Sequence, residues 1–296
     1  RPPRSTQGVS SAASDVYKRQ HVHMINNDLL DESSIHKNRF PNTPLDSIKD
    51  WYKLVLPKRE VNSLILGKPM FGTDVNAHNE YIREEIKDNN LIRAHRLTTP
   101  LDSLSDIERD IKEHGFQGLK VYRYFSSSGD INECNIEDYL THEQMELAND
   151  LGIWITLHMA KQDGCGDKEN LKNLEEFTTK KYPKIKWILA HVARSFTYRP
   201  IEKAIDTLKN LPNIWYDLSA VTDVRPFITL FKNEDHKRIF YGTDGIESVS
   251  FHGAYTAYGH FHYQIETDKV ESLNFSHTSN LSLIHISEPT RLGMIS

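Results

Sequence analysis

The chain has few cysteines, and this scarcity excludes several kinds of small protein. Only Cys134 and Cys165 are present among 296 residues, and they do not form a CxxC pair. Disulfide scaffolds and zinc ribbons need several cysteines at short spacing, so neither is expected. Two isolated cysteines suit a reducing compartment, and we take the cytoplasm as the expected location.

The sequence also lacks long apolar runs and an excess of positive charge. No apolar stretch approaches the roughly 20 residues that a membrane-spanning helix needs. The chain carries 36 Lys and Arg against 41 Asp and Glu, a formal net charge of −5. An acidic chain offers no electrostatic footprint for duplex nucleic acid or for an anionic membrane. We therefore expect neither of these partners and favour a protein that acts on a small molecule, as a monomer or a homo-oligomer.

Both ends of the chain are expected to be foreign to the fold. Residues 10–20 (SSAASDVYKRQ) and 281–291 (LSLIHISEPTR) are similar to translations of the two arms of a sequencing adapter. We exclude residues 1–20 and 281–296 from fold reasoning. A disordered polar tail at each end is the alternative, and it would be excluded as well. Residues 21–280 then form a single domain, because no change of composition marks a linker.

Apolar, strand-like runs alternate with polar segments of helical period, which predicts βα units around a parallel sheet. Strands are expected at residues 21–25, 63–67, 91–95, 118–122, 153–158, 185–191, 213–218 and 238–242. Helices are expected at residues 45–54, 76–87, 104–113, 142–151, 168–181, 200–209 and 224–233. Two helices have start signals, because Thr141 precedes Gln144 at the spacing of a capping box and Pro200 suits a first helical turn.

Eight strands with intervening helices in roughly 250 residues match the size of a closed (β/α)8 TIM barrel. A doubly wound open sheet is the alternative, but it usually carries a Gly-rich turn after its first strand. Residues 21–31 contain no glycine. The sequence therefore predicts an α/β fold of the barrel type, truncated at both ends.

Polar residues occur in a consistent order at the C-terminal ends of the predicted strands, where barrels hold their catalytic groups. His21 and His23 lie on the first strand, His158 closes the fifth, His191 closes the sixth, and Asp244 follows the eighth. Residues i and i+2 of a strand share a face, so the first two imidazoles can aim at one point. Taken singly, each residue has an ordinary alternative as a surface histidine, a core histidine or a turn aspartate. Their joint placement predicts a site for one divalent metal ion, with Zn2+ as the first choice and Mn2+ or another transition metal as alternatives.

The segments HVHM, ITLHMA, ILAHVAR and FYGTDG resemble the amidohydrolase-related superfamily, specifically its mononuclear branch of lactonases, decarboxylases and hydratases. By matched position, the resemblance implies that the metal ligands are His21, His23, His158 and Asp244. It also implies that His191 lies beside the metal, where it transfers a proton or stabilises the transition state. The ordered set is specific for the superfamily but says little about the substrate.

The expected activity is that of a metal-dependent hydrolase acting on a small lactone, ester or amide. A bound divalent metal lowers the pKa of its water from 15.7 toward roughly 7. Asp244 would serve as ligand and base, and His191 would polarise the carbonyl or donate a proton to the leaving group. A metal-dependent decarboxylase or hydratase of an unsaturated carboxylic acid is the alternative. A nuclease or phosphoesterase resembles the chain less, and a catalytically inactive barrel that binds a small ligand is the alternative from another class.

Three basic residues are candidates for binding a substrate carboxylate: Arg96 after the third strand, and Lys120 and Arg123 at the fourth. The guanidinium fork matches a carboxylate, although a solvated rim arginine is the alternative. Lys120 also raises the question of a second metal, because binuclear relatives carry a carboxylated lysine on the fourth strand. We prefer the mononuclear interpretation, and a lysine that snorkels at the rim is the remaining alternative.

Overall fold

The structure is a computed structural model, and it describes residues 20–34, 37, 42–55, 61–89, 92–245, 255–258 and 261–264. Eight parallel strands follow one another around a single sheet in chain order. They are β1 (Gln20–Met24), β2 (Ser63–Gly67), β3 (Ile92–Thr98), β4 (Gly118–Tyr122), β5 (Trp154–His158), β6 (Lys186–Leu189), β7 (Ile214–Asp217) and β8 (Ile239–Phe240). A parallel bridge between His21 and Gly242 joins the last strand to the first. The predicted (β/α)8 barrel is confirmed, and the expected foreign segments lie outside the described residues except for Gln20.

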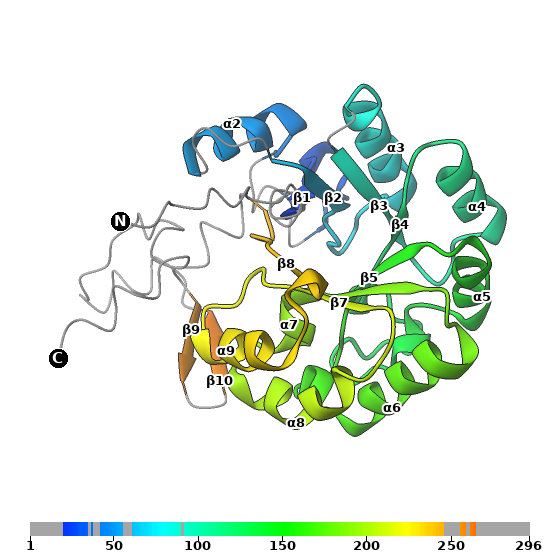
Figure 1. The fold of residues 1–296 in the computed structure, drawn as a ribbon. Coiled ribbons are helices and arrows are strands. Elements are labelled where there is room, and N and C mark those ends of the chain that lie inside the picture. The colour runs from blue at the N-terminus through cyan, green and yellow to red at the C-terminus, as the bar shows by residue number, and fades with distance from the viewer. Residues whose placement is uncertain are drawn as a thin grey trace, which may run out of the picture.

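Helices cover the outside of the strands, as Figure 1 shows. They are α2 (Leu45–Val55), α3 (Val75–Ile86), α4 (Leu104–Lys112), α5 (His142–Leu151), α6 (Lys168–Glu176), α8 (Tyr198–Leu208) and α9 (Val224–Asn233). The capping box at Thr141 and Gln144 is present, and Pro200 lies in the first turn of α8. A two-stranded antiparallel hairpin follows, made of β9 (Tyr255–Tyr258) and β10 (Phe261–Gln264). Among the described residues, no helix is both long and apolar enough to cross a membrane.

Two predicted elements end earlier than the sequence suggested. The helix expected over residues 168–181 changes character after Glu176, because Phe177–Lys181 form a π-helical turn. The strand expected over residues 185–191 ends at Leu189, and the next segment, α7 (Ala190–Arg194), has left-handed backbone angles. The prediction that His191 closes a strand is therefore wrong, since this residue begins a left-handed turn.

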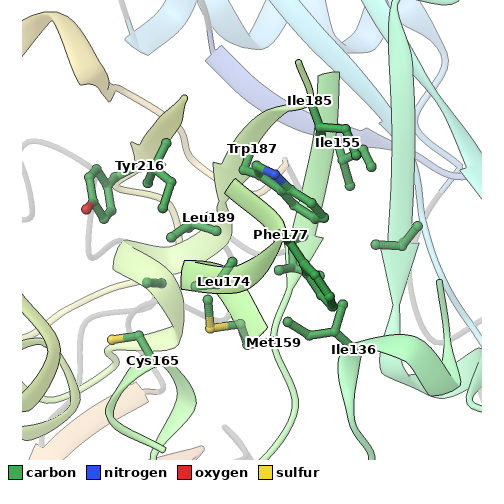
Figure 2. Packing of buried hydrophobic residues seen from close by; sticks show 14 of the residues in the cluster. Ile136, Ile155, Met159, Cys165, Leu174, Phe177, Ile185, Trp187, Leu189 and Tyr216 are labelled. Carbon is green, nitrogen blue, oxygen red and sulfur yellow. The ribbon is translucent and has the colours of Figure 1, made fainter. Parts of the chain in front are cut away.

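The outward faces of the strands form the main core, together with the inward faces of the helices. The largest cluster includes Trp187, Leu189 and Tyr216 from the strands and Leu174 from α6 (Figure 2). Trp187 stacks on Phe177 with the ring centroids 6.2 Å apart and an interplanar angle of 20°. This packing explains the apolar residues at alternate strand positions, because each strand buries one face against the helices.

The other face of each strand points into the barrel. Leu64, Leu66 and Ile188 form a small apolar cluster there, and Trp154, Trp215 and Phe240 pack against it. By the same alternation, His21, His23, Lys120, His158 and Asp217 share the inward face. Each of these five residues is at most 5% exposed. The barrel therefore encloses a polar cluster next to an apolar one.

Candidate metal centre and substrate pocket

The two histidines of β1 turn one ring nitrogen each toward the same point. His23 donates from Nδ1 to the Gly67 carbonyl over 3.1 Å, and His21 donates from Nδ1 to the Asp217 carboxylate over 2.9 Å. The two Nε2 atoms are 3.3 Å apart. In the neutral rings both Nε2 atoms carry lone pairs, because the Nδ1 atoms hold the protons. Two facing lone pairs at this distance favour a shared cation.

Asp244 supplies a negative oxygen to the same point from the loop after β8. Its Oδ1 lies 3.1 Å from His23 Nε2 and 3.4 Å from His21 Nε2. Burial by itself raises the pKa of Asp244, but Lys68, His191 and His23 together hold it well below the ordinary value. The carboxylate therefore stays ionised at neutral pH.

The donor chemistry of these three side chains fits a metal ion. Each offers one ligand atom, and the ligand atoms of His21, His23 and Asp244 lie within 4.8 Å of one another. Two imidazoles and one carboxylate match a site with three protein ligands and an open position, as zinc enzymes use, and manganese accepts the same donors. Burial lowers the pKa of His23, so its ring is neutral and can bind a metal at neutral pH.

His158 and His191 lie beside this group, with their ring centroids 5.0 Å apart. His158 donates from Nδ1 to the Met159 carbonyl over 3.0 Å, so its Nε2 is left for a ligand. Among the described residues, the group of ligand atoms within 4.8 Å does not include His158. Its role as a fourth ligand stays a prediction.

His191 is held at Nδ1 by Ser219, and its ring stacks on that of His21. Its Nδ1 lies 3.0 Å from both the carbonyl oxygen and the hydroxyl of Ser219. Its ring centroid is 5.9 Å from that of His21, and Phe196 stacks on it at 5.3 Å. Burial lowers the pKa of His191, so the ring is neutral near pH 7 and presents Nε2 as a proton acceptor.

Asp217 is a functional candidate that the sequence analysis missed. It ends β7, is 1% exposed, and contacts His21, the backbone of His191 and Ser219. The rule that polar residues at strand ends form the site applies to it as it does to Asp244. The segment IWYDLS carries the signal, since an aspartate that directly ends an apolar strand must face either helices or barrel interior.

Of the three basic candidates, Lys120 is in the barrel interior. Its side chain is 0% exposed, and among the described residues its Nζ has no hydrogen-bond partner. The Nζ lies 5.6 Å from the centroid of the Tyr122 ring. Burial lowers the pKa of Lys120 to about 8, against the opposing effect of Asp244 and Asp217.

Arg96 lies on the other side of the sheet, away from the site. Its Nε donates to Asp110 over 2.6 Å, and its Nη1 donates to Asp102 and to the Leu97 carbonyl. It is 1% exposed and ties β3 to α4. The expectation that Arg96 binds a substrate carboxylate is wrong, because both carboxylates that it contacts belong to the protein. The alternation would have shown this, since its neighbour His95 faces inward.

Arg123 is at the rim above β4, beside Arg194. Arg123 donates from Nη1 to the Ile131 carbonyl and the Asn132 side chain, and its buried Nε has no hydrogen-bond partner among the described residues. Arg194 donates to the Met159 carbonyl over 3.0 Å. Burial and the charge of Arg123 lower the pKa of Arg194. Lys68, which the sequence analysis also missed, acts electrostatically on Asp244 and Lys120, so it adds a third cation at this end of the barrel.

Aromatic rings lead from the rim to the histidines. Phe71 stacks on Tyr124 at 4.4 Å, Tyr124 meets Tyr122 at 4.8 Å, and Tyr122 lies 4.4 Å from His158. A cavity of about 450 Å3 nearby is lined by Arg194, Phe196 and Thr197 and by residues of the β4 and β5 loops and of α8, and its lining includes none of the candidate metal ligands. Flat rings and cations around one site suit a planar anion.

Comparisons with known proteins agree with this architecture. A model of the family described as Amidohydrolase matches residues 60–275. The fold resembles a dihydroxybenzoic acid decarboxylase from Polaromonas sp. JS666, solved with bound manganese and the inhibitor 2-nitroresorcinol (TM-score 0.55, 13% identity, 77% of this chain and 86% of that one). It also resembles 2,6-dihydroxybenzoate decarboxylase from Rhizobium (TM-score 0.53, 13% identity, 77% and 87%) and an uncharacterised TIM-barrel protein from Bordetella bronchiseptica (TM-score 0.51, 10% identity, 76% and 85%). No curated protein matches the chain.

Proposed function

The chain belongs to the amidohydrolase family, and from this premise we propose that it is a metal-dependent lyase that decarboxylates a small, planar, unsaturated or aromatic carboxylic acid. The sequence-based expectation placed hydrolysis first and decarboxylation or hydration second. The buried Lys120, the aromatic rings beside His158 and the fold neighbours favour the second of these. Two of those neighbours are decarboxylases of dihydroxybenzoates, and one of them holds manganese.

The observation that carries the proposal is the buried ammonium group of Lys120. It has no hydrogen-bond partner among the described residues and lies on the same inward face as the metal-site histidines. A buried charge without a partner is costly, so its retention indicates a ligand that supplies the opposite charge. A substrate carboxylate meets this need, and it would lie within reach of the ligand cluster.

The rings and the arginines support the same class of substrate. Tyr122 and Tyr124 offer flat apolar surface beside His158. Arg123 and Arg194 add two cations at the rim that contact backbone carbonyls and an amide rather than a carboxylate in their described hydrogen bonds. A planar acid would therefore find stacking surface and charge complementarity together.

A divalent ion held by His21, His23 and Asp244, with His158 as the proposed fourth ligand, would supply Lewis acidity toward a substrate oxygen. Lys120 and the arginines bind and orient the carboxylate. His191 takes up a proton from solvent at Nε2 and passes it to the substrate carbon that bears the carboxylate, where a π electron pair of the substrate forms the new C–H bond. The bond between that carbon and the carboxyl group then breaks, its electron pair restores the π system, and carbon dioxide leaves, so that the proton replaces the carboxylate. The lowered pKa of His191 makes its protonated form a stronger acid for this transfer.

Hydrolysis of a small lactone or ester is the second candidate, and one observation favours it. Asp244 stays ionised beside the histidines, as a base that activates water must. Carbon dioxide release distinguishes the two reactions, because only the lyase produces it.

The experiment is a parallel screen of metal-loaded protein against hydroxybenzoates and against lactones. We expect carbon dioxide release from at least one aromatic acid, measured by coupled gas detection and product chromatography. His191→Gln should abolish turnover and keep the metal, whereas His23→Gln should lose both. Hydrolysis without carbon dioxide release would contradict the lyase and support the hydrolase. Ligand binding without turnover would support the catalytically inactive barrel.

A further inference from the structure

One buried carboxylate contacts both a histidine of the metal cluster and the turn that carries His191. The Oδ2 of Asp217 accepts from His21 Nδ1 over 2.9 Å. The Oδ1 of Asp217 accepts from the backbone N–H of His191 over 3.2 Å, from the N–H of Ser219 over 2.9 Å and from the Ser219 hydroxyl. The two oxygens thus have separate partners.

The hydrogen bond at Oδ2 determines which nitrogen of His21 carries the proton. A carboxylate accepts and does not donate, so Nδ1 must hold the hydrogen and Nε2 is left with its lone pair. That Nε2 is the atom that faces His23 and Asp244. A partner on the far nitrogen of a metal-binding histidine fixes the tautomer and the orientation of the ring.

The hydrogen bonds at Oδ1 hold a backbone conformation that L-residues avoid. The four residues of the turn, His191, Val192, Ala193 and Arg194, have φ of 59°, 52°, 55° and 61°. A left-handed run of this kind is unfavourable for every non-glycine residue, so the surrounding structure must impose it. The hydrogen bond from the His191 N–H to Asp217 anchors its first residue.

We propose that Asp217 is a positioning residue that sets the tautomer of His21 and anchors the left-handed turn that presents His191. This inference rests on the metal site proposed above but not on the reaction. It can therefore be tested without a substrate, and its failure is distinguishable from a failure of the proposed decarboxylation.

Asp217→Asn keeps the contacts at Oδ1 and changes the one at Oδ2. The three donors at Oδ1 require the amide oxygen in that position. The amide NH2 then faces His21 Nδ1, which must become an acceptor, and the proton of the neutral ring moves to Nε2. The protonated Nε2 cannot bind a metal. Asp217→Ala removes the contacts of both oxygens, and it should leave His21 as a mixture of tautomers and the His191 turn without its anchor.

The test combines 15N NMR of histidine-labelled, metal-free protein with Mn2+ and Zn2+ affinity measured by competition with a chelator. His21 is assigned from the spectrum of His21→Gln. We expect the Nδ1–H tautomer at His21 in the unchanged protein and the Nε2–H tautomer in Asp217→Asn, with a metal affinity 10- to 100-fold weaker.

Asp110→Asn is the matched control, because Asp110 is another buried carboxylate that accepts from a histidine and an arginine outside the barrel interior. It should keep the His21 tautomer and the metal affinity. An unchanged metal affinity in Asp217→Asn, or an equal loss in the control, would overturn the proposal. If Asp217→Asn fails to fold, an Nε2–H tautomer of His21 in the unchanged protein would still overturn it.

Discussion

At the scale of single residues, Lys120 lowers the stability of the fold through its burial and holds the carboxylate in the proposed function, and the two effects can be measured separately. Its pKa falls from the model-peptide value of 10.5 to about 8 on burial. At neutral pH this shift corresponds to roughly 3 kcal/mol against folding, because 1 pKa unit equals about 1.4 kcal/mol. Asp244 and Asp217 offset part of the burial effect, which this net shift already includes.

We predict that Lys120→Met stabilises the protein and abolishes turnover. Methionine fills a similar volume without a charge, so the unfolding free energy should rise by roughly 1–3 kcal/mol, measured by urea denaturation at pH 7. Lys186→Met is the control, since Lys186 shares the inward face but is partly exposed above Trp154. A loss of stability in Lys120→Met would mean that the ammonium group has a stabilising partner.

The pKa of Lys120 also gives the pH dependence a direction. In the proposed function the protonated amine binds the substrate carboxylate, so KM for an acid substrate should rise as the pH increases through about 8. Stability should change the other way. The folded pKa lies below the unfolded one, so the unfolded chain holds more protons between pH 8 and 10.5 and stability increases across that window. Both trends should disappear in Lys120→Met, and a KM that stays flat up to pH 10 would exclude the amine as the carboxylate partner.

At the scale of elements, the left-handed turn after β6 depends on a glycine in the loop after β5. Gly164 has φ +48°, and a Cβ there would lie 2.9 Å from both the Cβ and the carbonyl oxygen of Arg194. The two loops pack so closely that only glycine fits. This contact fixes Arg194 and, through the turn, His191.

We predict that Gly164→Ala displaces the turn and lowers turnover at least tenfold while the protein keeps its metal. The unfolding free energy should fall by roughly 3 kcal/mol, from the left-handed backbone and the contact together. Gly115→Ala is the control, because Gly115 has φ +80° and nothing within 4 Å of its added Cβ. It should cost only about 1 kcal/mol and leave turnover unchanged. Equal effects in the two variants would show that contact with the turn is unimportant.

At the scale of the whole molecule, the sequence predicts the barrel because each strand buries one face and each helix buries one stripe of apolar residues. The two-residue repeat of the strands and the 3.6-residue repeat of the helices can both be seen in the sequence. The positions of His21, His23 and Asp244 follow from the same logic, since strand alternation and strand ends are local properties. The left-handed turn at His191 is not predictable in this way, because the contacts that impose it come from Gly164 and Asp217, which are distant in the chain. Arg96 was assigned to the site from its place after a predicted strand. It is adjacent to His95, which faces the barrel interior, so strand alternation turns the Arg96 side chain outward toward the helices.

The proposed metal site lies at the seam that closes the barrel. His21 and His23 come from β1, Asp244 follows β8, and the two strands are joined by the bridge between His21 and Gly242. The N–H groups of Thr243 and Asp244 both donate to the His21 carbonyl over 3.2 Å. A metal bound to all three side chains would therefore tie the first strand to the last.

We predict that metal removal lowers the melting temperature and loosens this seam before the rest of the barrel. A metal present at 100 times its Kd adds about 2.7 kcal/mol, which corresponds to a shift of roughly 5 °C or more for a domain of this size. Scanning calorimetry with and without chelator measures the shift, and hydrogen exchange should increase first at β1 and β8. His23→Gln should melt at one temperature under both conditions. If the chelator leaves the unchanged protein's melting temperature and exchange pattern as they were, the three side chains do not hold a metal that joins the two strands.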